Sequence, residues 1–165
     1  MSRTEPGLGC GLSSGWLLVL LAACSGPTPD SDATRQAARL PQEATVRSGD
    51  LLVRASTVPT MTLSTAVARQ YGIARDAGTV LLLVGVRRVA GEEETSVPAR
   101  VNATAVDLLG KRQAPVIREV RSGDFIDYVG SFRIAAPETL RFDVEVVADS
   151  GQRATLQFNR DFFRP

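Results

Sequence analysis

Carboxylate side chains are the groups in this sequence best suited to enzymatic chemistry, because the chain contains no histidine. They fall into three groups, which are Asp124 with Asp127, Asp143 with Glu145, and the run Glu92–Glu94. Two carboxyl groups can act as general acid and nucleophile in glycoside hydrolysis when a cleft gives them different environments. The spacing of Asp143 and Glu145 instead places both on one solvated face of a strand. We therefore interpret these acids as surface residues, and the two pairs are the residues that a hydrolase would have to use.

Other catalytic and metal-binding arrangements lack their usual residues. Without histidine, neither a Ser-His-Asp triad nor a Cys-His pair can form, and zinc has lost its commonest ligand. Cys10 and Cys24 both belong to a segment that we assign below to export, so the exported domain offers no free thiol. The one lysine, Lys111, stands in an expected turn, where an exposed amine is a poor base. The sequence therefore predicts a protein that is not an enzyme and binds neither metal nor cofactor.

Length and charge narrow the class of protein further. The chain has 165 residues and a formal net charge of +1, from 19 basic and 18 acidic residues. This length suffices for one domain with a sizeable core. The basic residues are spread along the chain, so no basic patch favours nucleic acid as a partner.

The beginning of the chain has the features of an export signal. Residues 12–23 form an apolar stretch that is too short to span the roughly 30 Å hydrocarbon core of a bilayer. At its end, Leu21-Ala22-Ala23-Cys24 resembles the bacterial lipobox. This resemblance implies a signal peptide over residues 1–23, cleavage between Ala23 and Cys24, and a lipid on the sulfur of Cys24. In Gram-negative lipoproteins a serine after that cysteine, here Ser25, implies sorting to the periplasmic face of the outer membrane.

Residues 24–43 are predicted to form a flexible tether, because they are rich in Pro, Ser, Thr, Asp and Ala. The lipid on Cys24 makes the membrane an expected partner, and the tether lets the folded domain at residues 44–165 stand away from it.

From Val46 onward, apolar residues recur at every second position, which is the period of a strand with one buried face. Leu140–Val146 is the clearest segment, with four apolar residues alternating with three charged ones. Seven such segments occur, at 51–55, 80–86, 101–105, 117–120, 126–128, 140–146 and 156–158. The short connections favour antiparallel hairpins. We predict an all-β fold, an immunoglobulin-like antiparallel β-sandwich of about seven strands, with a small β-barrel as the alternative.

The tetrapeptide Arg-Ser-Gly-Asp occurs twice, at 47–50 and 121–124, each time before two bulky apolar residues. We predict turns that enter strands at both places, with a duplicated binding loop as the alternative.

One segment departs from the strand pattern. Ser64 can cap a helix, helix-forming residues follow it, and Gly72 can end the helix. The segment predicts about two helical turns, in which Val67 and Tyr71 share a face and cover an open end of the sandwich. In the alternative, the same helix is a lid over a ligand pocket.

Aromatic side chains are expected mostly in the core, but Phe162 and Phe163 are adjacent in a strand, so alternation exposes one of them. An exposed aromatic residue indicates a contact surface. The candidate interaction surface consists of Tyr71, Asp124, Asp127, Tyr128 and Phe163.

The order and spacing of several motifs resemble a domain-of-unknown-function family of small exported proteobacterial proteins. The resemblance covers about residues 50–163. It rests on the segments Ala66–Ile73, Asp107–Gly110, Ile117–Val120, Gly123–Asp124, Tyr128, Glu138–Val146 and Leu156–Phe158. Where the family carries an asparagine in its first long strand, this chain has Leu-Leu-Leu-Val-Gly-Val. The resemblance implies a single periplasmic β-sandwich and supplies no activity or catalytic residue.

Together these observations predict a non-catalytic lipoprotein of the cell envelope. Its domain would be a periplasm-facing module of the outer membrane that binds another envelope protein. The alternative function is a small-ligand carrier or sensor, with a pocket beneath the Ser64–Gly72 helix.

Overall fold

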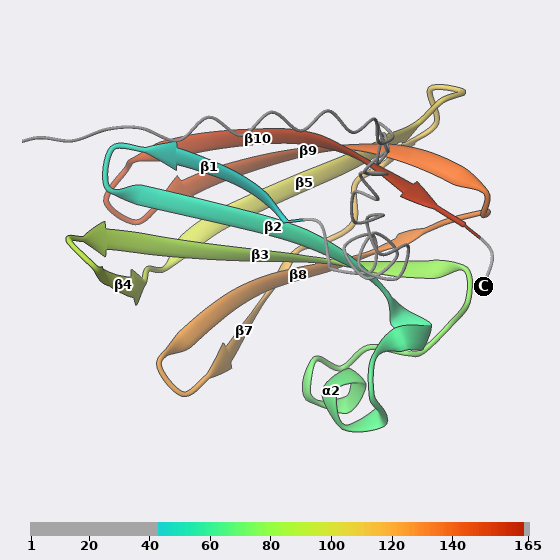
Figure 1. Ribbon diagram of the computed structural model, residues 1–165, viewed down its shortest axis with the longest axis horizontal. Helices are drawn as coiled ribbons and strands as arrows, with labels where there is room; N and C mark the ends of the chain where they lie inside the picture. The colour runs from blue at the N-terminus through green and yellow to red at the C-terminus, as the bar shows by residue number, and fades with distance from the viewer. Residues whose placement is uncertain (1–42, 164–165) are drawn as a thin grey trace, which may run out of the picture. The chain divides into compact units, whose positions relative to one another are not determined.

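Two antiparallel sheets face each other in the computed structural model, which describes residues 43–163 (Figure 1). One sheet has six strands, with the order β1-β2-β3-β8-β7 and with β4 also paired to β3; the other has four, in the order β10-β9-β5-β6. The strands of the six-stranded sheet are β1 (Ala44–Ser48), β2 (Leu51–Pro59), β3 (Thr79–Ala90), β4 (Glu93–Ser96), β7 (Arg118–Ser122) and β8 (Phe125–Arg133). The strands of the four-stranded sheet are β5 (Ala99–Asp107), β6 (Arg112–Gln113), β9 (Glu138–Ala148) and β10 (Arg153–Phe162).

The predicted β-sandwich is confirmed, and no pairing between the described strands closes the sheets into the alternative small barrel. The predicted number of about seven strands is too low, because β1, β4 and β6 were not expected. These strands are two to five residues long and carry few apolar side chains, so they give no visible alternation.

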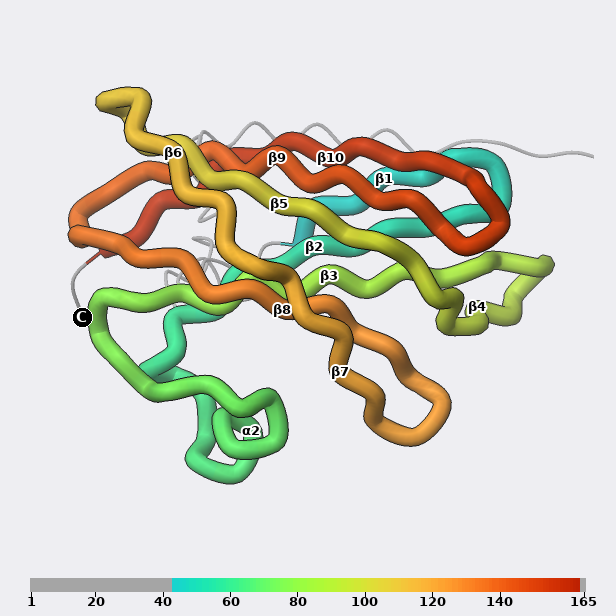
Figure 2. The backbone as a smooth tube through the Cα atoms, turned by 180° about the vertical axis from the view of Figure 1, so that it is seen from behind, coloured from blue at the N-terminus to red at the C-terminus, as the bar shows by residue number. Residues whose placement is uncertain are grey.

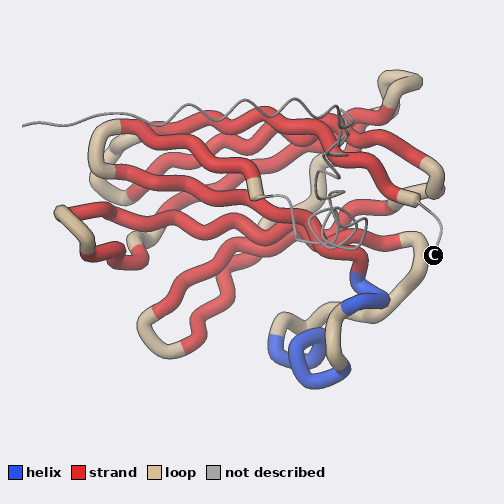
Figure 3. Tube along the Cα trace, viewed as in Figure 1, coloured by secondary structure: helices blue, strands red, loops and turns tan. Residues whose placement is uncertain are grey.

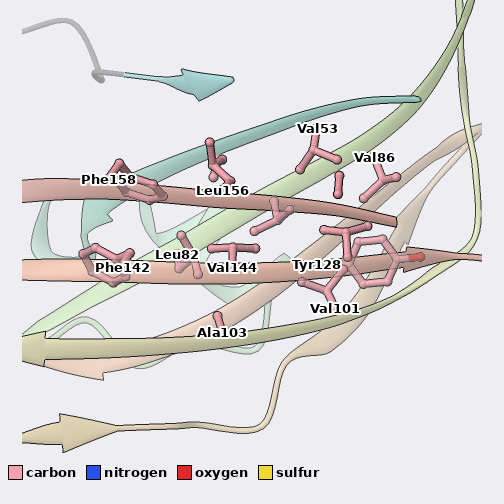
Figure 4. Close-up of a cluster of buried hydrophobic side chains, with 14 of the residues drawn as sticks. Val53, Leu82, Val86, Val101, Ala103, Tyr128, Phe142, Val144, Leu156 and Phe158 are labelled. Atoms are coloured by element: carbon pink, nitrogen blue, oxygen red, sulfur yellow. The ribbon is translucent and has the colours of Figure 1, made fainter. Parts of the chain in front are cut away.

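The core lies between the sheets and follows the alternation of the sequence. In β9, Leu140, Phe142, Val144 and Val146 point inward and are buried, while the charged residues between them point outward. Phe142 contacts aromatic rings of both sheets: it lies edge-on to Phe132 at 5.1 Å and stacks on Phe158 at 5.2 Å. Figure 4 shows part of this core, including Phe142 and Phe158, with Tyr128 at one end and its hydroxyl oxygen directed away from the other labelled side chains.

Both Arg-Ser-Gly-Asp segments form hairpin turns that enter strands, as predicted. The first connects β1 to β2 and the second connects β7 to β8. Gly49 and Gly123 have φ values of 61° and 58° there, a left-handed conformation that glycine adopts without strain.

The predicted helix is confirmed as α2 (Thr65–Gln70), which follows the 3-10 turn η1 (Thr60–Thr62) in the lobe coloured blue in Figure 3. The hydroxyl of Ser64 accepts a hydrogen bond from the backbone N–H of Val67 at 3.2 Å, and Gly72 follows the helix with φ 62°. The helix does not cover an open end of the sandwich. It lies over the outer face of the six-stranded sheet, where Arg118 of β7 donates a hydrogen bond to the carbonyl of Tyr71 at 2.8 Å.

The signal peptide at 1–23, Cys24 and all but the last residue of the 24–43 tether lie outside the described residues. Within the described range, none of the helices is both long enough and apolar enough to cross a bilayer.

Candidate binding site

We call the open side of the sandwich the side where β5, beyond its short pairing with β6, is the edge of one sheet and β7 is the edge of the other. The chain between β6 and β7 crosses this side (Figure 2). Backbone groups along a strand point alternately to its two sides. The N–H of Ala99 points away from β9, since it donates to the hydroxyl of Tyr128 at 2.6 Å, and Ala105 pairs with Gln113 of β6 on that same side. Val101 and Ala103 lie between Ala99 and Ala105 at every second position of β5, so their backbone groups point to the same side. Their N–H and C=O groups therefore face the open side, where none of the described strands pairs with them.

The short length of β6 explains why this part of β5 remains an edge. Its register pairs Ala105 with Gln113, and continuing it would place Pro115 opposite Ala103. Proline has no N–H and cannot donate the next interstrand hydrogen bond. The chain instead leaves the four-stranded sheet and crosses to the other sheet, where β7 begins (Figure 2).

Two side-chain hydrogen-bond systems join the sheets on this side. The amide of Gln113 donates to the carbonyl of Arg133 and accepts from its N–H, both at 2.8 Å, so it imitates a strand pairing with the end of β8. The hydroxyl of Tyr128 donates to the carboxylate of Glu119 at 3.4 Å in addition to accepting from Ala99. Burial raises the pKa of Tyr128, and Glu119 raises it further against the opposing effect of the Ala99 N–H. The phenol is therefore neutral at physiological pH and can serve as donor and acceptor at once.

A hollow of about 320 Å³ lies beside this edge. Three charged residues, Arg100, Glu119 and Asp149, contribute to its lining, and most of the exposed lining surface is polar. The complete lining is Ala99, Arg100, Val101, Ile117, Glu119, Tyr128 and Asp149. Unpaired backbone groups and flanking charges of both signs suit an extended peptide better than a small molecule.

A second group of polar residues lies on the outer face of the six-stranded sheet. Arg87 forms an ion pair with Asp127 at 3.2 Å, and the other oxygen of Asp127 accepts a hydrogen bond from the hydroxyl of Tyr71 at 3.3 Å. Burial raises the pKa of Tyr71, and the charge of Asp127 raises it further. Arg87 also donates to the carbonyl of Ile126 at 2.9 Å. Because these polar groups form an ion pair and hydrogen bonds with one another, we interpret them as a network that fixes α2 on the sheet.

Several apolar residues of α2 and of the six-stranded sheet outside the core cluster are buried. Ala68 is only 3% exposed. Leu81 and Val129 are buried as well, although neither belongs to the cluster between the sheets. Their alternation with the core residues Val80, Leu82 and Tyr128 places them on the outer face of the six-stranded sheet. The pocket expected beneath the Ser64–Gly72 helix stays a prediction.

The five predicted surface residues do not form one surface. Tyr71 and Asp127 meet across 56 positions of sequence. Tyr128 lies on the opposite face of the same strand, Asp124 is exposed in the turn between β7 and β8, and Phe163 follows β10 with 76% of its surface exposed. Phe162 is buried, which confirms that alternation separates the two phenylalanines.

The two carboxylate pairs lie in different parts of the fold, with Asp124 in the turn before β8 and Asp127 in the six-stranded sheet. Asp143 and Glu145 line an open polar hollow of about 580 Å³ on the outer face of the four-stranded sheet, where Asp143 accepts a hydrogen bond from Gln157 and pairs with Arg141. Within residues 43–163, no three His, Cys, Asp or Glu side chains are placed to share a metal ion.

The sequence did not indicate Val101 and Ala103 as edge residues. The alternation of residues along a strand does not reveal which side of that strand lacks a neighbouring strand. Pro115, shortly after the Gly110 turn, was the available signal, since a proline there limits the returning strand of the hairpin.

These features define a two-layer antiparallel β-sandwich with an open edge at β5. The chain belongs to the DUF4426 family, described as a domain of unknown function, whose profile matches residues 45–164. A crystal structure of a DUF4426 family protein from Pseudomonas aeruginosa is 29% identical, with a TM-score of 0.64 over 74% of this chain and 96% of that protein. The predicted resemblance to a domain-of-unknown-function family is thus confirmed.

More distant structures share the fold alone. A copper-bound variant of FetP from uropathogenic Escherichia coli strain F11 is 12% identical, with a TM-score of 0.54 over 76% of this chain and 92% of that one. The as-isolated FetP of the same strain, expressed in the periplasm of E. coli, is 10% identical, with a TM-score of 0.54 over 74% and 95% of the two chains. No curated protein matches the chain.

Proposed function

We propose that this chain is a non-catalytic lipoprotein of the cell envelope, anchored through Cys24 on the periplasmic face of the outer membrane, and that it binds an extended segment of another envelope protein along the open edge of β5. The observation that carries the proposal is the pair of unpaired backbone positions, Val101 and Ala103, between the Tyr128 hydrogen bond and β6. The anchor and the location rest on the sequence at Leu21–Ser25.

Strand addition explains why this edge suits a partner. A peptide that pairs with β5 would gain backbone hydrogen bonds at positions 101 and 103, and it would extend the four-stranded sheet. Natural edge strands that must not pair are protected by charges or by proline. Four of the five residues of β7 are charged or polar, with Val120 as the exception. At Val101 and Ala103 of β5 the side chains are buried in the core, so neither position carries a charge or a proline that would block pairing.

The flanking charges would select the partner. Arg100, Glu119 and Asp149 line the hollow beside the edge. A peptide with charges of both signs around a short apolar centre would complement them, while a uniformly charged peptide would meet repulsion at one or more positions.

Two other functions receive less support. A small-ligand carrier would need a pocket beneath α2, whereas Ala68 of that helix is buried and Tyr71 at its end is hydrogen-bonded to Asp127. A hydrolase would need two carboxyl groups in different environments across a cleft, whereas Asp143 and Glu145 share one open face.

Site-specific photo-crosslinking in intact cells tests the proposal. A photoreactive amino acid at position 100 should capture one reproducible envelope protein, while the same residue at Arg153 in β10 should not. Ala103→Pro removes an N–H that faces the open side without touching the β9 ladder, so it should abolish capture. Ala103→Gly keeps that N–H and should retain capture.

Folding must be checked for each variant by circular dichroism, and Val101→Pro provides a second edge variant with the same expected loss. A folded Ala103→Pro or Val101→Pro protein that captures the same partner as before would overturn the binding site. Cys24→Ser tests the anchor separately, because it should release the protein from the membrane fraction without altering binding to the captured partner in solution.

A further inference from the structure

The hairpin turn between β5 and β6 projects beyond the rest of the sandwich, as both Figure 1 and Figure 2 show. Its backbone is fixed by Asp107. One carboxylate oxygen accepts hydrogen bonds from the N–H groups of Leu109 and Lys111 at 2.9 and 2.8 Å. The carbonyl of Asp107 accepts from Gly110 at 3.0 Å, and its N–H donates to Lys111 at 3.1 Å. These four hydrogen bonds hold the backbone of the tip in one conformation.

Two leucines occupy this tip and face solvent. Leu108 is 82% exposed and Leu109 is 95% exposed. Large apolar side chains that are displayed together on a fixed backbone indicate a contact with an apolar phase. Lys111 and Arg112 follow after Gly110 and are also exposed, so two cationic side chains lie at the β6 side of the base of the apolar tip.

We propose that the Leu108-Leu109 tip inserts into the interfacial layer of an anionic phospholipid bilayer, with Lys111 and Arg112 at the level of the lipid phosphates. The convex shape favours a bilayer as the occupant, because a projecting turn can enter lipid without a complementary cavity. The order of apolar tip and cationic base matches the depth profile of a membrane surface, where acyl chains lie beneath negatively charged headgroups. This contact would orient the sandwich relative to the membrane.

The inference rests on the proposed function only in that a lipid on Cys24 brings the domain within reach of a membrane. The tip's own chemistry is independent of that anchor. Lipidation and insertion can therefore fail separately, and the experiment must report both.

The test uses the purified protein with Cys10→Ser and Leu109→Cys, with an environment-sensitive fluorophore on position 109, reconstituted into vesicles of phosphatidylethanolamine and phosphatidylglycerol. Mass spectrometry of the same sample reports the lipid on Cys24. We expect a blue-shifted, brighter emission that is quenched by lipids with a shallow spin label. The matched control carries the fluorophore at Glu92→Cys, in the turn between β3 and β4, and should report an aqueous environment.

Two variants of the labelled protein separate the apolar and the ionic contributions. Leu108→Ser should lower the inserted fraction roughly ten-fold, because it removes most of one buried leucine side chain. Lys111→Gln with Arg112→Gln should weaken insertion into vesicles that contain phosphatidylglycerol and leave the weak response to pure phosphatidylcholine unchanged. An aqueous signal from position 109 in every vesicle, with Cys24 lipidated, would overturn the proposal and assign the tip to a protein partner instead. A missing lipid on Cys24 would contradict the anchor, and the emission would then be measured with Cys24→Ser added, so that position 109 carries the one thiol. A blue shift in that protein would support insertion.

Discussion

The hydroxyl of Tyr128 in β8 accepts a hydrogen bond from the backbone N–H of Ala99 in β5 at 2.6 Å, and this bond joins the two sheets at the margin of the open edge. Tyr128→Phe keeps the ring in the core and removes the acceptor. The N–H of Ala99 then loses its partner, which should reduce the free energy of unfolding by about 1–3 kcal/mol. Urea denaturation measures the change.

Tyr71→Phe is the matched control, because its hydroxyl makes a longer bond of 3.3 Å to Asp127 from a half-buried position. We expect a loss of at most about 1 kcal/mol for this variant. A larger loss for Tyr71→Phe than for Tyr128→Phe would contradict the role given to the bond between the sheets.

Alkaline pH should destabilise the fold through both tyrosines of the chain. Burial raises the pKa of Tyr71 and of Tyr128 above the ordinary value of 10.0. Below pH 10 both phenols are protonated in the folded and the unfolded chain, so their contribution to stability is fully present. Above it the unfolded chain ionises first, and the free energy of unfolding should fall as the pH rises. The near-ultraviolet absorbance of phenolate should appear at higher pH in the folded protein than in urea, and the two phenylalanine variants assign each step. Coincident titration curves would count against buried phenols.

Gly130→Ala should destabilise the protein because the segment that crosses between the sheets passes directly over Gly130. A Cβ atom there would lie 2.4 Å from Cδ1 of Ile117. We expect a loss of about 1 kcal/mol, at the low end for overpacking, because Cδ1 is the mobile end of the isoleucine side chain and can turn away. Ile117→Val removes the clashing methyl group, so the double variant should recover much of the loss in a double-mutant cycle measured by thermal unfolding. Additive losses in the cycle would show that this contact is not the cause.

The amide of Gln113 is expected to act as a donor and an acceptor at once. Gln113→Ala removes both hydrogen bonds to Arg133 and should cost about 1 kcal/mol in the free energy of unfolding, since the site is open to water. Gln113→Glu has nearly the same shape but offers only acceptors, so it places a carboxylate against the carbonyl of Arg133. Unfolding experiments should find Gln113→Glu no more stable than Gln113→Ala. If the glutamate variant matches the natural chain, the donated bond contributes nothing.

Local sequence signals predicted the elements that depend on neighbouring residues. The alternation at Leu140–Val146 gave the inward and outward faces of β9 correctly, and Ser64 with Gly72 marked the ends of the α2 segment. Both arise from interactions within a few positions of the chain, where periodicity and capping act.

The candidate site depends on relationships between distant residues and could not be read in the same way. Tyr71 and Asp127 were both named as surface residues, but their hydrogen bond joins a helix to a strand 56 positions away. The open edge at Val101 and Ala103 depends on which strand lies beside β5, and that is set by the register of β6 and by the crossing of the chain to β7. The alternation of apolar residues in β5 predicts neither the register of β6 nor the crossing of the chain to β7.

Residue-resolved amide hydrogen exchange of the purified, unbound protein tests the central claim most directly. The claim is that β5 keeps an unpaired hydrogen-bonding edge between Tyr128 and β6. We predict rapid exchange at Val101 and Ala103, whose N–H groups face the open side, and slow exchange at Asn102 and Thr104, whose N–H groups pair with β9. Equal protection at all four amides would mean that something already covers the edge, and it would contradict the proposed binding site.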